Sequence, residues 1–420
     1  MANVSSSNSQ KELAPRLRFP GFDGSWMVRK VGDFLTESKI PGSDGKLAKK
    51  LSVKLWAKGV VEKNAAFEGS EHTQYYVRHA GQFMYGKLDF LNCAFGIVPD
   101  KLDGYESTLD APAFNIHGID PIFLLNKVMQ PNFYKKNGEI ANGSRKAKRI
   151  HPDTFLEMEL VCPSVEEQKR IAEFITVIDA RIEAQRKLVD ALKSYKRGVS
   201  NAIFAHSVGF HHEGETETFT WCVMPFGEVF DFLNSNTLSR ADLNYFGGEV
   251  KNIHYGDILT KYGAITDPSS STVPYINIDA PLSYLKLDYL KTGDIVIADT
   301  AEDLTAGKVT EIACSNEAKC VSGLHTVACR PRQRFASGYL GHYLNSAYYH
   351  RQLLPLIQGT KVSSIARSAL AGTQIAFPCL SDQIKVSKCL SLIDTRVESE
   401  ERKLERLVEC KKSLLQKLFV

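Results

Sequence analysis

One segment of the sequence occurs twice, as PSVEEQKRIAEFITVIDARIEAQRKLVDALKSYKRGVSNAIF at residues 163–204 and as PCLSDQIKVSKCLSLIDTRVESEERKLERLVECKKSLLQKLF at residues 378–419. The two copies align without a gap at a constant offset of 215, and nine of their 42 positions are identical. Polar positions such as Gln168/Gln383 and Asp179/Asp394 are among the nine. Composition alone does not produce this register, so we interpret the chain as an internal duplication.

Each copy predicts a long helix. It begins just after a proline, and the first copy adds Ser164 and Glu167 at the spacing of a capping box. Apolar residues recur at steps of four and three, a 3.5-residue period typical of a coiled coil rather than of a helix packed on its own domain. The expected seam contains Ile171, Ile175, Ile178, Ile182, Val189, Leu192, Val199 and Ile203 in the first copy, and Val386, Leu390, Ile393, Val397, Leu404, Leu407, Leu414 and Leu418 in the second.

Two lysines interrupt the apolar seam and indicate the direction of pairing. An antiparallel pair places Lys196 beside Asp394 and Lys411 beside Asp179. A parallel pair places the two lysines against each other, where like charges repel with little screening. We therefore predict antiparallel helices.

The chain of 420 residues is long enough for two or three domains at ~150 residues each. We expect an α+β protein in which two mixed α/β domains are separated by two long helices that form an antiparallel coiled coil, with a pseudo-twofold internal repeat. The expected parts are a flexible tail (1–15), a first domain (16–163), a first helix (164–205), a linker (206–220), a second domain (221–378) and a second helix (379–420).

Secondary structure inside the second domain is read from short apolar runs. Runs rich in β-branched or aromatic residues and bounded by Gly, Pro or Asp predict strands at 257–262, 273–278, 294–299 and 325–330. Helical spacing of apolar residues predicts one helix over 338–357. The GDI sequences at Gly256 and Gly293 and the GKLD sequence at Gly86 are interpreted as turns that lead into strands.

Composition and motif content exclude several classes of protein. No apolar run approaches the ~18 residues that span a bilayer, so we expect a cytoplasmic protein. Nine cysteines without a CxxC pair indicate scattered buried thiols rather than a zinc site. The sequence holds no phosphate loop, HExxH, GxSxG elbow or kinase signature, and His211, His212 and Glu213 fall in a polar linker. We expect a chain without a catalytic site and without a metal.

Basic residues gather at the end of the first domain. Seven Lys or Arg against the single acid Glu139 lie between Lys127 and Arg149, although the whole chain carries only +4. Such side chains neutralise DNA phosphates, and Arg and Asn also hydrogen-bond to base edges. A weaker version recurs at the end of the second domain, which favours DNA over a merely solvated face. The candidate DNA contacts are Lys135, Lys136, Asn137, Arg145, Lys146, Lys148, Arg149, Tyr75, Tyr76, Arg78, Lys361, Ser363, Ser364, Arg367, Arg330, Arg332 and Arg334.

Two motifs occur once in each half of the chain. A P-x-x-x-[ED]-Q sequence (163–168 and 378–383) opens each helix, which then carries I-D-x-R-[IV]-E (178–183 and 393–398). With the opening PRLRFPGFDGSW (15–26), this layout resembles the specificity subunit of type I restriction-modification systems over nearly the whole chain. In the second copy, Ser381 and Asp382 replace the Glu166 and Glu167 of the first, which weakens the signal for the helix start.

The resemblance implies a role and a set of partners. Two target recognition domains would each read one half of a bipartite site in double-stranded DNA. The helices would set the spacer and dock two methyltransferase subunits, which restriction subunits join to make an ATP-dependent nuclease. S-adenosylmethionine, ATP and Mg²⁺ would bind only in those partners. Two alternatives remain from the residues alone: a coiled-coil scaffold that does not bind DNA, and a fused methyltransferase–endonuclease fragment, against which the missing motifs argue.

Overall fold

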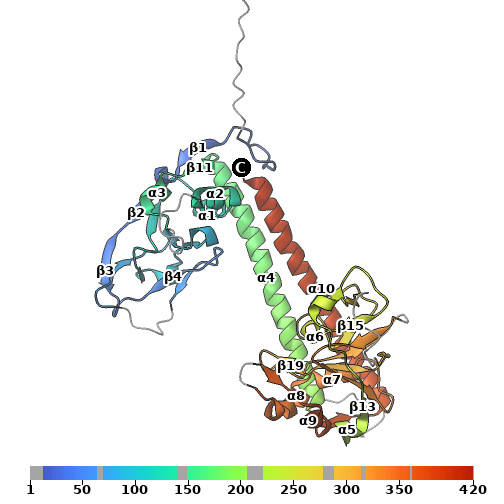
Figure 1. Ribbon diagram of the computed structural model, residues 1–420. Helices are drawn as coiled ribbons and strands as arrows, with labels where there is room; N and C mark the ends of the chain where they lie inside the picture. Colours follow the sequence, from blue (N-terminus) through green and yellow to red (C-terminus); the bar gives the residue numbers. More distant parts are fainter. Residues whose placement is uncertain are drawn as a thin grey trace, which may run out of the picture. The chain divides into compact units, whose positions relative to one another are not determined.

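A computed structural model describes residues 13–63, 70–139, 149–205, 221–277, 288–313, 318–359 and 362–419. The chain divides into two compact units. The first unit is Met1–Arg186 with Arg402–Val420, and the second unit is Lys187–Glu401. The long helices α4 (Val165–Phe204) and α10 (Leu380–Leu418) each contribute to both units, and their bounds agree with the expected helices within one or two residues (Figure 1).

The first unit is built on a four-stranded antiparallel sheet in the order β2-β10-β7-β8. These strands are Leu35–Ser38, Ala113–Ile116, Phe83–Tyr85 and Phe95–Ile97. Three aromatic residues of the sheet, Phe83, Tyr85 and Phe114, contact Phe155 of α3 (Pro152–Leu156) at ring distances of 4.7–5.7 Å. Such stacked and tilted ring pairs add to the free energy of burying the rings.

Smaller sheets, helices and turns complete the first unit. They are β3 (Ile40–Asp44), β6 (Gln74–Val77) and β9 (Glu106–Ser107) in one sheet, β4 (Leu51–Val53) with β5 (Val60–Glu62), the helices α1 (Pro121–Val128) and α2 (Pro131–Gly138), and the 3-10 turns η1 (Val31–Asp33), η2 (Phe90–Asn92) and η3 (Asp100–Leu102).

The second unit holds a five-stranded sheet, β13-β22-β18-β20-β16, and a four-stranded sheet, β14-β17-β15-β21. The central strand β18 (Ile295–Ala298) is buried at every position, as its unbroken apolar sequence requires. The other strands are β13 (Phe230–Phe232), β22 (Thr326–Pro331), β20 (Val309–Ile312), β16 (Ile265–Thr266), β14 (Leu243–Asn244), β17 (Tyr275–Ile276), β15 (Lys251–Ile253) and β21 (Cys320–Ser322).

Helices and short pairs surround these sheets. They are α5 (Phe226–Val229), η4 (Arg240–Asp242), α6 (Tyr255–Thr260), α7 (Tyr339–Leu344), α8 (Ala347–Leu353), η6 (Leu354–Leu356), α9 (Arg367–Ala371), and β19 (Thr300–Ala301) with β23 (Ser363–Ser364).

The start and end of each globular part pair with each other. In the first unit β1 (Met27–Lys30) is antiparallel to β11 (Glu159–Cys162), and in the second unit β12 (Cys222–Pro225) is antiparallel to β24 (Gln374–Phe377). A glycine follows each first strand. A Cβ on Gly32 would lie 3.1 Å from the Leu156 carbonyl oxygen, and one on Gly227 would lie 3.4 Å from that of Ala371. The two glycines therefore allow a close approach to the last short helix of each part.

The two long helices contact each other in both units. In the first unit, Ile171 and Ile175 near the start of α4 share a core with Leu418 and Phe419. In the second unit, the core instead joins the end of α4 to the start of α10, through Ile203, Phe204, Val386 and Leu390. Each of the sixteen expected seam residues is buried or half-buried.

Both ion pairs expected at the seam are present. The Lys411 ammonium contacts Asp179 within the first unit, and the Lys196 ammonium contacts Asp394 within the second. Within each unit the two helix segments therefore run in opposite directions, as the positions of the lysines predict.

Two secondary-structure predictions in the second unit are wrong. Residues 257–262 do not form a strand. Tyr255–Thr260 is helix α6, because the His254 Nδ1 accepts a hydrogen bond from the Gly256 N–H and caps a first turn that contains Asp257. Gly256 is therefore helical and does not form a turn before a strand. Residues 338–357 form two helices rather than one, since the Ser346 Oγ accepts the Tyr349 N–H at 3.2 Å and starts α8.

The sequence also led to expectations about membrane spans, metal sites and cysteines. Within the described ranges, no helix is long and apolar enough to cross a membrane, and no group of three His, Cys, Asp or Glu could hold a metal ion. Of the described cysteines, Cys93, Cys162, Cys320 and Cys329 are buried thiols, whereas Cys222, Cys379 and Cys410 are exposed. The expected linker 206–220 and residues 1–12 of the expected tail lie outside the described residues.

Candidate nucleic-acid interface

The predicted basic surface of the first unit is described in part. Lys135 and Lys136 on α2 are exposed, and Asn137 is half-buried. Arg149 is half-buried, with its Nε 3.4 Å from an oxygen of Asp110. The remaining candidates of this loop, Arg145, Lys146 and Lys148, lie outside the described residues.

Two basic residues of the first unit belong to its core, which corrects the prediction. Arg78 is 0% exposed, and its guanidinium donates hydrogen bonds of 2.8 Å to the Ser107 Oγ and the Ser38 carbonyl oxygen. Burial lowers the pKa of Arg78 to about 10. Lys127 is also buried, its ammonium lies 5.9 Å from the centre of the Trp26 ring, and burial lowers its pKa to about 8. Neither charge is available to DNA.

Tyrosines lie beside two buried cations. Tyr75 and Tyr76 on β6 are half-buried, and their rings contact the charged groups of Lys50 and Arg78 at 5.7 Å. These tyrosines are partly accessible, but they also cover the buried charges.

The candidates of the second unit also divide into structural and accessible residues. Arg330 donates to both carboxylate oxygens of buried Asp294, at 2.9 and 2.7 Å, which is a structural contact. Arg332 pairs with Asp231 at 2.9 Å on the surface. In β23, Ser363 is buried and Ser364 is exposed, and the exposed Arg367 follows this strand. Arg334 is exposed, and Lys361 lies outside the described residues.

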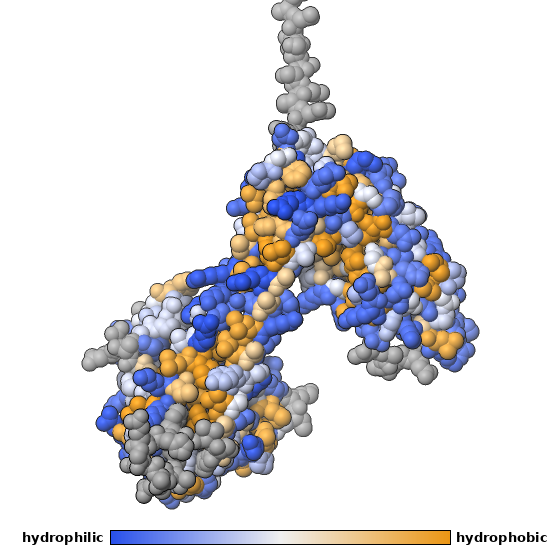
Figure 2. Space-filling view, turned by 180° about the vertical axis from the view of Figure 1, so that it is seen from behind, coloured by the Kyte–Doolittle hydropathy of each residue, from blue (hydrophilic) through white to orange (hydrophobic). Residues whose placement is uncertain are grey.

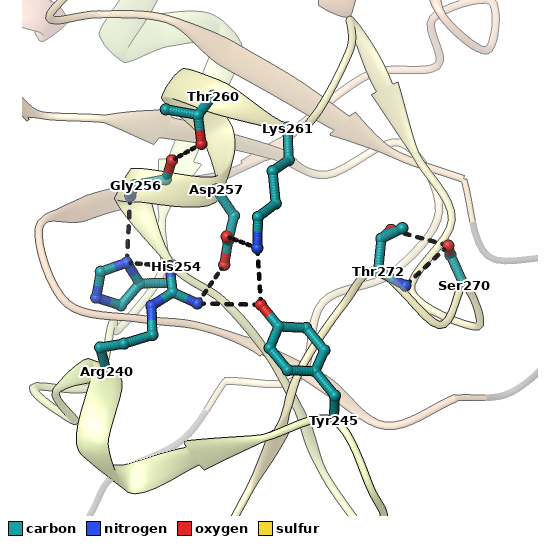
Figure 3. A network of polar contacts seen from close by, with 9 residues as sticks. All are labelled: Arg240, Tyr245, His254, Gly256, Asp257, Thr260, Lys261, Ser270 and Thr272. Atoms are coloured by element: carbon teal, nitrogen blue, oxygen red, sulfur yellow. Dashed lines mark hydrogen bonds and ion pairs between the residues drawn. The ribbon is translucent and has the colours of Figure 1, made fainter. Parts of the chain in front are cut away.

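A cationic cluster forms around the start of α6 (Figure 3). The buried carboxylate of Asp257 accepts a hydrogen bond from Arg240 Nη1 at 2.8 Å and pairs with Lys261 Nζ at 3.0 Å. Both cations also reach the Tyr245 hydroxyl, at 3.4 Å from Arg240 and 2.9 Å from Lys261. The hydrogen bonds to Tyr245 and Asp257 raise the pKa of Lys261. One carboxylate thus holds two cations and a phenol at the surface.

A series of contacts between aromatic side chains extends from this cluster to β19. The Arg240 Nη2 lies 3.3 Å from His254 Nδ1, and the rings of His254 and Tyr255 are 4.7 Å apart. Burial, with the nearby Arg240 charge, lowers the pKa of His254, so this imidazole is neutral at pH 7. Tyr255 contacts His325 edge-on at 5.2 Å, and His325 Nδ1 lies 3.4 Å from the Thr300 Oγ1. Polar and aromatic side chains therefore connect Arg240 to the β19–β23 pair.

Phe246 is 100% exposed beside this cluster. Its backbone is held by Asn244, whose Oδ1 accepts the N–H groups of Phe246 at 2.9 Å and Gly247 at 3.0 Å. The amide of Asn244 in turn donates to Asn277 at 2.7 Å. In the space-filling view, hydrophobic and hydrophilic residues are interspersed on the visible face of each unit (Figure 2). A fully exposed phenylalanine on an anchored loop is nevertheless a contact candidate, since apolar side chains can insert between the base steps of a duplex.

His325 has a left-handed backbone conformation, with a φ of 52°. Trp56, Ala57 and Cys93 also have positive φ, so this conformation is not particular to the surface around Arg240. Sequence reasoning did not identify Arg240, Tyr245, Phe246, Lys261 or His325. The Asn-Tyr-Phe-Gly-Gly run at 244–248 is a turn signal that could have indicated the loop. The other contacts join residues far apart in the sequence.

The second half of the chain matches a known family. The family described as "Type I restriction modification DNA specificity domain" matches residues 219–409. A curated relative, the type I restriction enzyme MjaVIII specificity subunit of Methanocaldococcus jannaschii, is 24% identical over 278 residues, which is 63% of this chain and 62% of that protein. Over residues 219–409 the chain is similar to type I DNA specificity domains, and it spans 62% of the length of this first curated relative.

Other specificity subunits are similar to the chain over a greater length. The putative type I restriction enzyme MjaX specificity subunit of the same organism is 22% identical and covers 73% of this chain and 72% of its own. The crystal structure of the S subunit from M. genitalium has a TM-score of 0.56 at 14% identity and covers 97% of this chain and 99% of its own. A structure from a study of type I complex assembly and conformational transition has a TM-score of 0.55 at 17% identity and covers 96% and 99%. These likenesses show a shared α+β fold.

Proposed function

We propose that this chain is the DNA recognition subunit of a type I restriction-modification complex. The observation that carries the proposal is the specificity domain at 219–409, together with an exposed cationic and aromatic surface on that same domain. Residues 16–163 and 221–378 would be the two target recognition domains, each reading one half of a bipartite site in double-stranded DNA.

The proposed arrangement is an antiparallel coiled coil that relates two similar halves by a pseudo-twofold axis. Equivalent contacts in the two units support it. The Gln168 side chain accepts the Asp120 N–H at 3.0 Å and donates to the Pro163 carbonyl oxygen at 3.0 Å. The equivalent Gln383 accepts the Ala336 N–H at 3.0 Å and donates to its own proline carbonyl at 2.9 Å.

The ends of the helices are equivalent in the same way. Phe204 at the end of α4 lies 5.4 Å from the Tyr343 ring in the core of the second unit. Phe419, its counterpart in the repeat, lies 5.4 Å from the Phe123 ring in the core of the first unit. Each helix would thus begin at its own domain and end in the core of the other, which makes the helix length a fixed spacer between them.

The chemistry of the complex would lie in other subunits. We propose that two methyltransferase subunits bind along the helices and that restriction subunits complete the complex. S-adenosylmethionine, ATP and Mg²⁺ would be bound by those subunits, and this chain would supply recognition without a catalytic residue. Its contacts to DNA would come from Arg240, Phe246 and Arg367 in the second unit, and from Lys135 and Lys136 in the first.

Salt dependence of DNA binding tests the proposal. Cations that contact phosphate release counterions, so the affinity of the full chain for duplex should fall steeply with salt concentration. Arg367→Ala should reduce the slope by about 1, because one phosphate contact is lost. Phe246→Ala should weaken binding about tenfold with the slope unchanged, because the ring carries no charge and an apolar side chain contacts a duplex by insertion between base steps.

Val223→Ala is the matched control, because Val223 is also an exposed apolar residue of the second unit. Fluorescence anisotropy with a duplex that carries the methylated site mapped in host DNA provides the measurement. A slope near zero for the unaltered chain would instead favour a protein-binding scaffold.

A further inference from the structure

The second unit contains a cavity of about 560 Å³ that the proposed DNA contacts do not use. Its walls are the last turns of α4, the turn between α6 and β16, the loop before β20 and the junction of α7 and α8. Cavities of this size accommodate small organic ligands such as a nucleotide.

The charged groups at the cavity are all of one sign. Lys196, Arg197 and Lys308 line it, and the described lining residues include no Asp or Glu. Asp394 does not line the cavity, but it contacts two residues that do, Lys196 and His342. Two cations, Arg197 and Lys308, therefore face the cavity without a carboxylate in its lining.

Lys308 is half-buried, and the hydrogen-bond acceptor of its ammonium is a neutral carbonyl group. Its Nζ donates to the Leu259 carbonyl oxygen at 3.0 Å, a neutral acceptor. Burial, and then the nearby Lys196, lower the pKa of Lys308. A second ammonium close by disfavours the charged lysine, and an anion between the two groups would relieve that repulsion.

Arg197 supplies a second, exposed cation from α4. Its Nη2 donates to the Ser194 Oγ at 3.0 Å, one turn back on its own helix, and the residue is exposed. A planar guanidinium matches the oxygens of a phosphate, and lysine adds a point charge. Ser200 and Asn201, on the next turn of the helix, add neutral hydrogen-bonding groups to the same wall.

The rest of the cavity is suited to an organic group. Leu304, Ala264, Ala347 and Leu390 give it an apolar surface. His342 also lines the cavity, and burial lowers its pKa to about 4, so its imidazole adds no charge at pH 7. The cavity thus combines one cationic side with one apolar side.

We propose that this cavity binds a phosphate-bearing ligand, with the phosphate between Lys308 and Arg197 and the organic part against Leu390 and Ala347. Two sources supply that chemistry: a free nucleotide, and a backbone phosphate of bound DNA. The second source rests on the proposed function, whereas the first does not.

The nucleotide source is tested by titrating the full chain with ADP and, separately, with inorganic pyrophosphate in a calorimeter at low salt. Arg197→Ala and Lys308→Gln should each weaken ADP binding at least tenfold. Lys187→Ala, an exposed cation on α4 outside the cavity, should leave ADP binding unchanged. Arg197 is on the surface, so its variant decides the matter even if Lys308→Gln fails to fold.

The DNA source is tested with the same variants and a duplex. If ADP and pyrophosphate do not bind, Arg197→Ala and Lys308→Gln must each lower the salt slope of duplex binding by about 1 relative to Lys187→Ala. The absence of both effects overturns the proposal. An unaltered chain that binds no duplex at any salt concentration overturns the proposed function instead, and the ADP titration then decides this inference alone.

Discussion

At the scale of one residue, Arg78 is a basic side chain that the sequence suggests as a DNA contact but that stabilises the core of the first unit. Its guanidinium is buried and donates to Ser107 and to the Ser38 carbonyl oxygen. We predict that Arg78→Met lowers the free energy of unfolding by about 3 kcal/mol, because buried acceptors lose their donor. Urea unfolding of the full chain measures this. Arg149→Ala should change it by less than about 0.5 kcal/mol, since that ion pair is long and half-exposed. Equal effects would contradict the interpretation.

A second prediction at the residue scale is that His342 makes the free energy of unfolding depend on pH. Burial lowers its pKa to about 4, with Asp394 opposing that change and Lys196 adding to it. The unfolded chain takes up this proton near pH 6.5 and the folded chain only near pH 4, so stability from the neutral imidazole is lost as pH falls between those values. We predict that the free energy of unfolding falls by about 3 kcal/mol more over this range than in His342→Gln. Parallel curves from urea titrations would refute it.

At the scale of the element, the segments of α4 and α10 within each unit are linked by buried apolar residues and one Lys–Asp ion pair. We predict that Asp179→Asn combined with Asp394→Asn lowers the free energy of unfolding by about 1 kcal/mol, because both lysines at the seam lose their partners. Thermal melting followed by circular dichroism at 222 nm gives the measurement. Asp190→Asn, an exposed acid on α4, serves as the control. A double variant that melts with the control would contradict this role for the ion pairs.

At the scale of the whole molecule, the helices would act as a spacer between two reading domains. Inserting one heptad between Arg186 and Lys187 and another between Glu401 and Arg402 leaves both units intact, because the unit boundaries lie there. Each helix lengthens by ~10 Å. We predict that the spacer of the recognised site grows by about 3 base pairs while both half-sites stay the same. Methylation mapping in cells that carry the partner subunits reads out the site. An unchanged spacer in a folded variant would exclude the spacer role, and an insertion in one helix alone should abolish recognition.

Features that follow from regular residue spacing could be predicted from the sequence alone. The seam from Ile171 to Leu418, both long helices and the partners of Lys196 and Lys411 depend on local periodicity and on one pairing rule, so residue spacing alone predicts them. The strand at 294–299 was also predictable, because a central strand buried on both faces needs an unbroken apolar run.

The cap at His254 that turns 257–262 into a helix was decided only by the tertiary structure, as was the surface around Arg240 and Phe246. So was the difference between buried Arg78 and exposed Arg367. These three features depend on which segments, far apart in the sequence, come into contact in the folded chain. Spacing along the chain carries the periodicity of a helix, whereas the burial of a charge depends on neighbours that only the folded chain brings together.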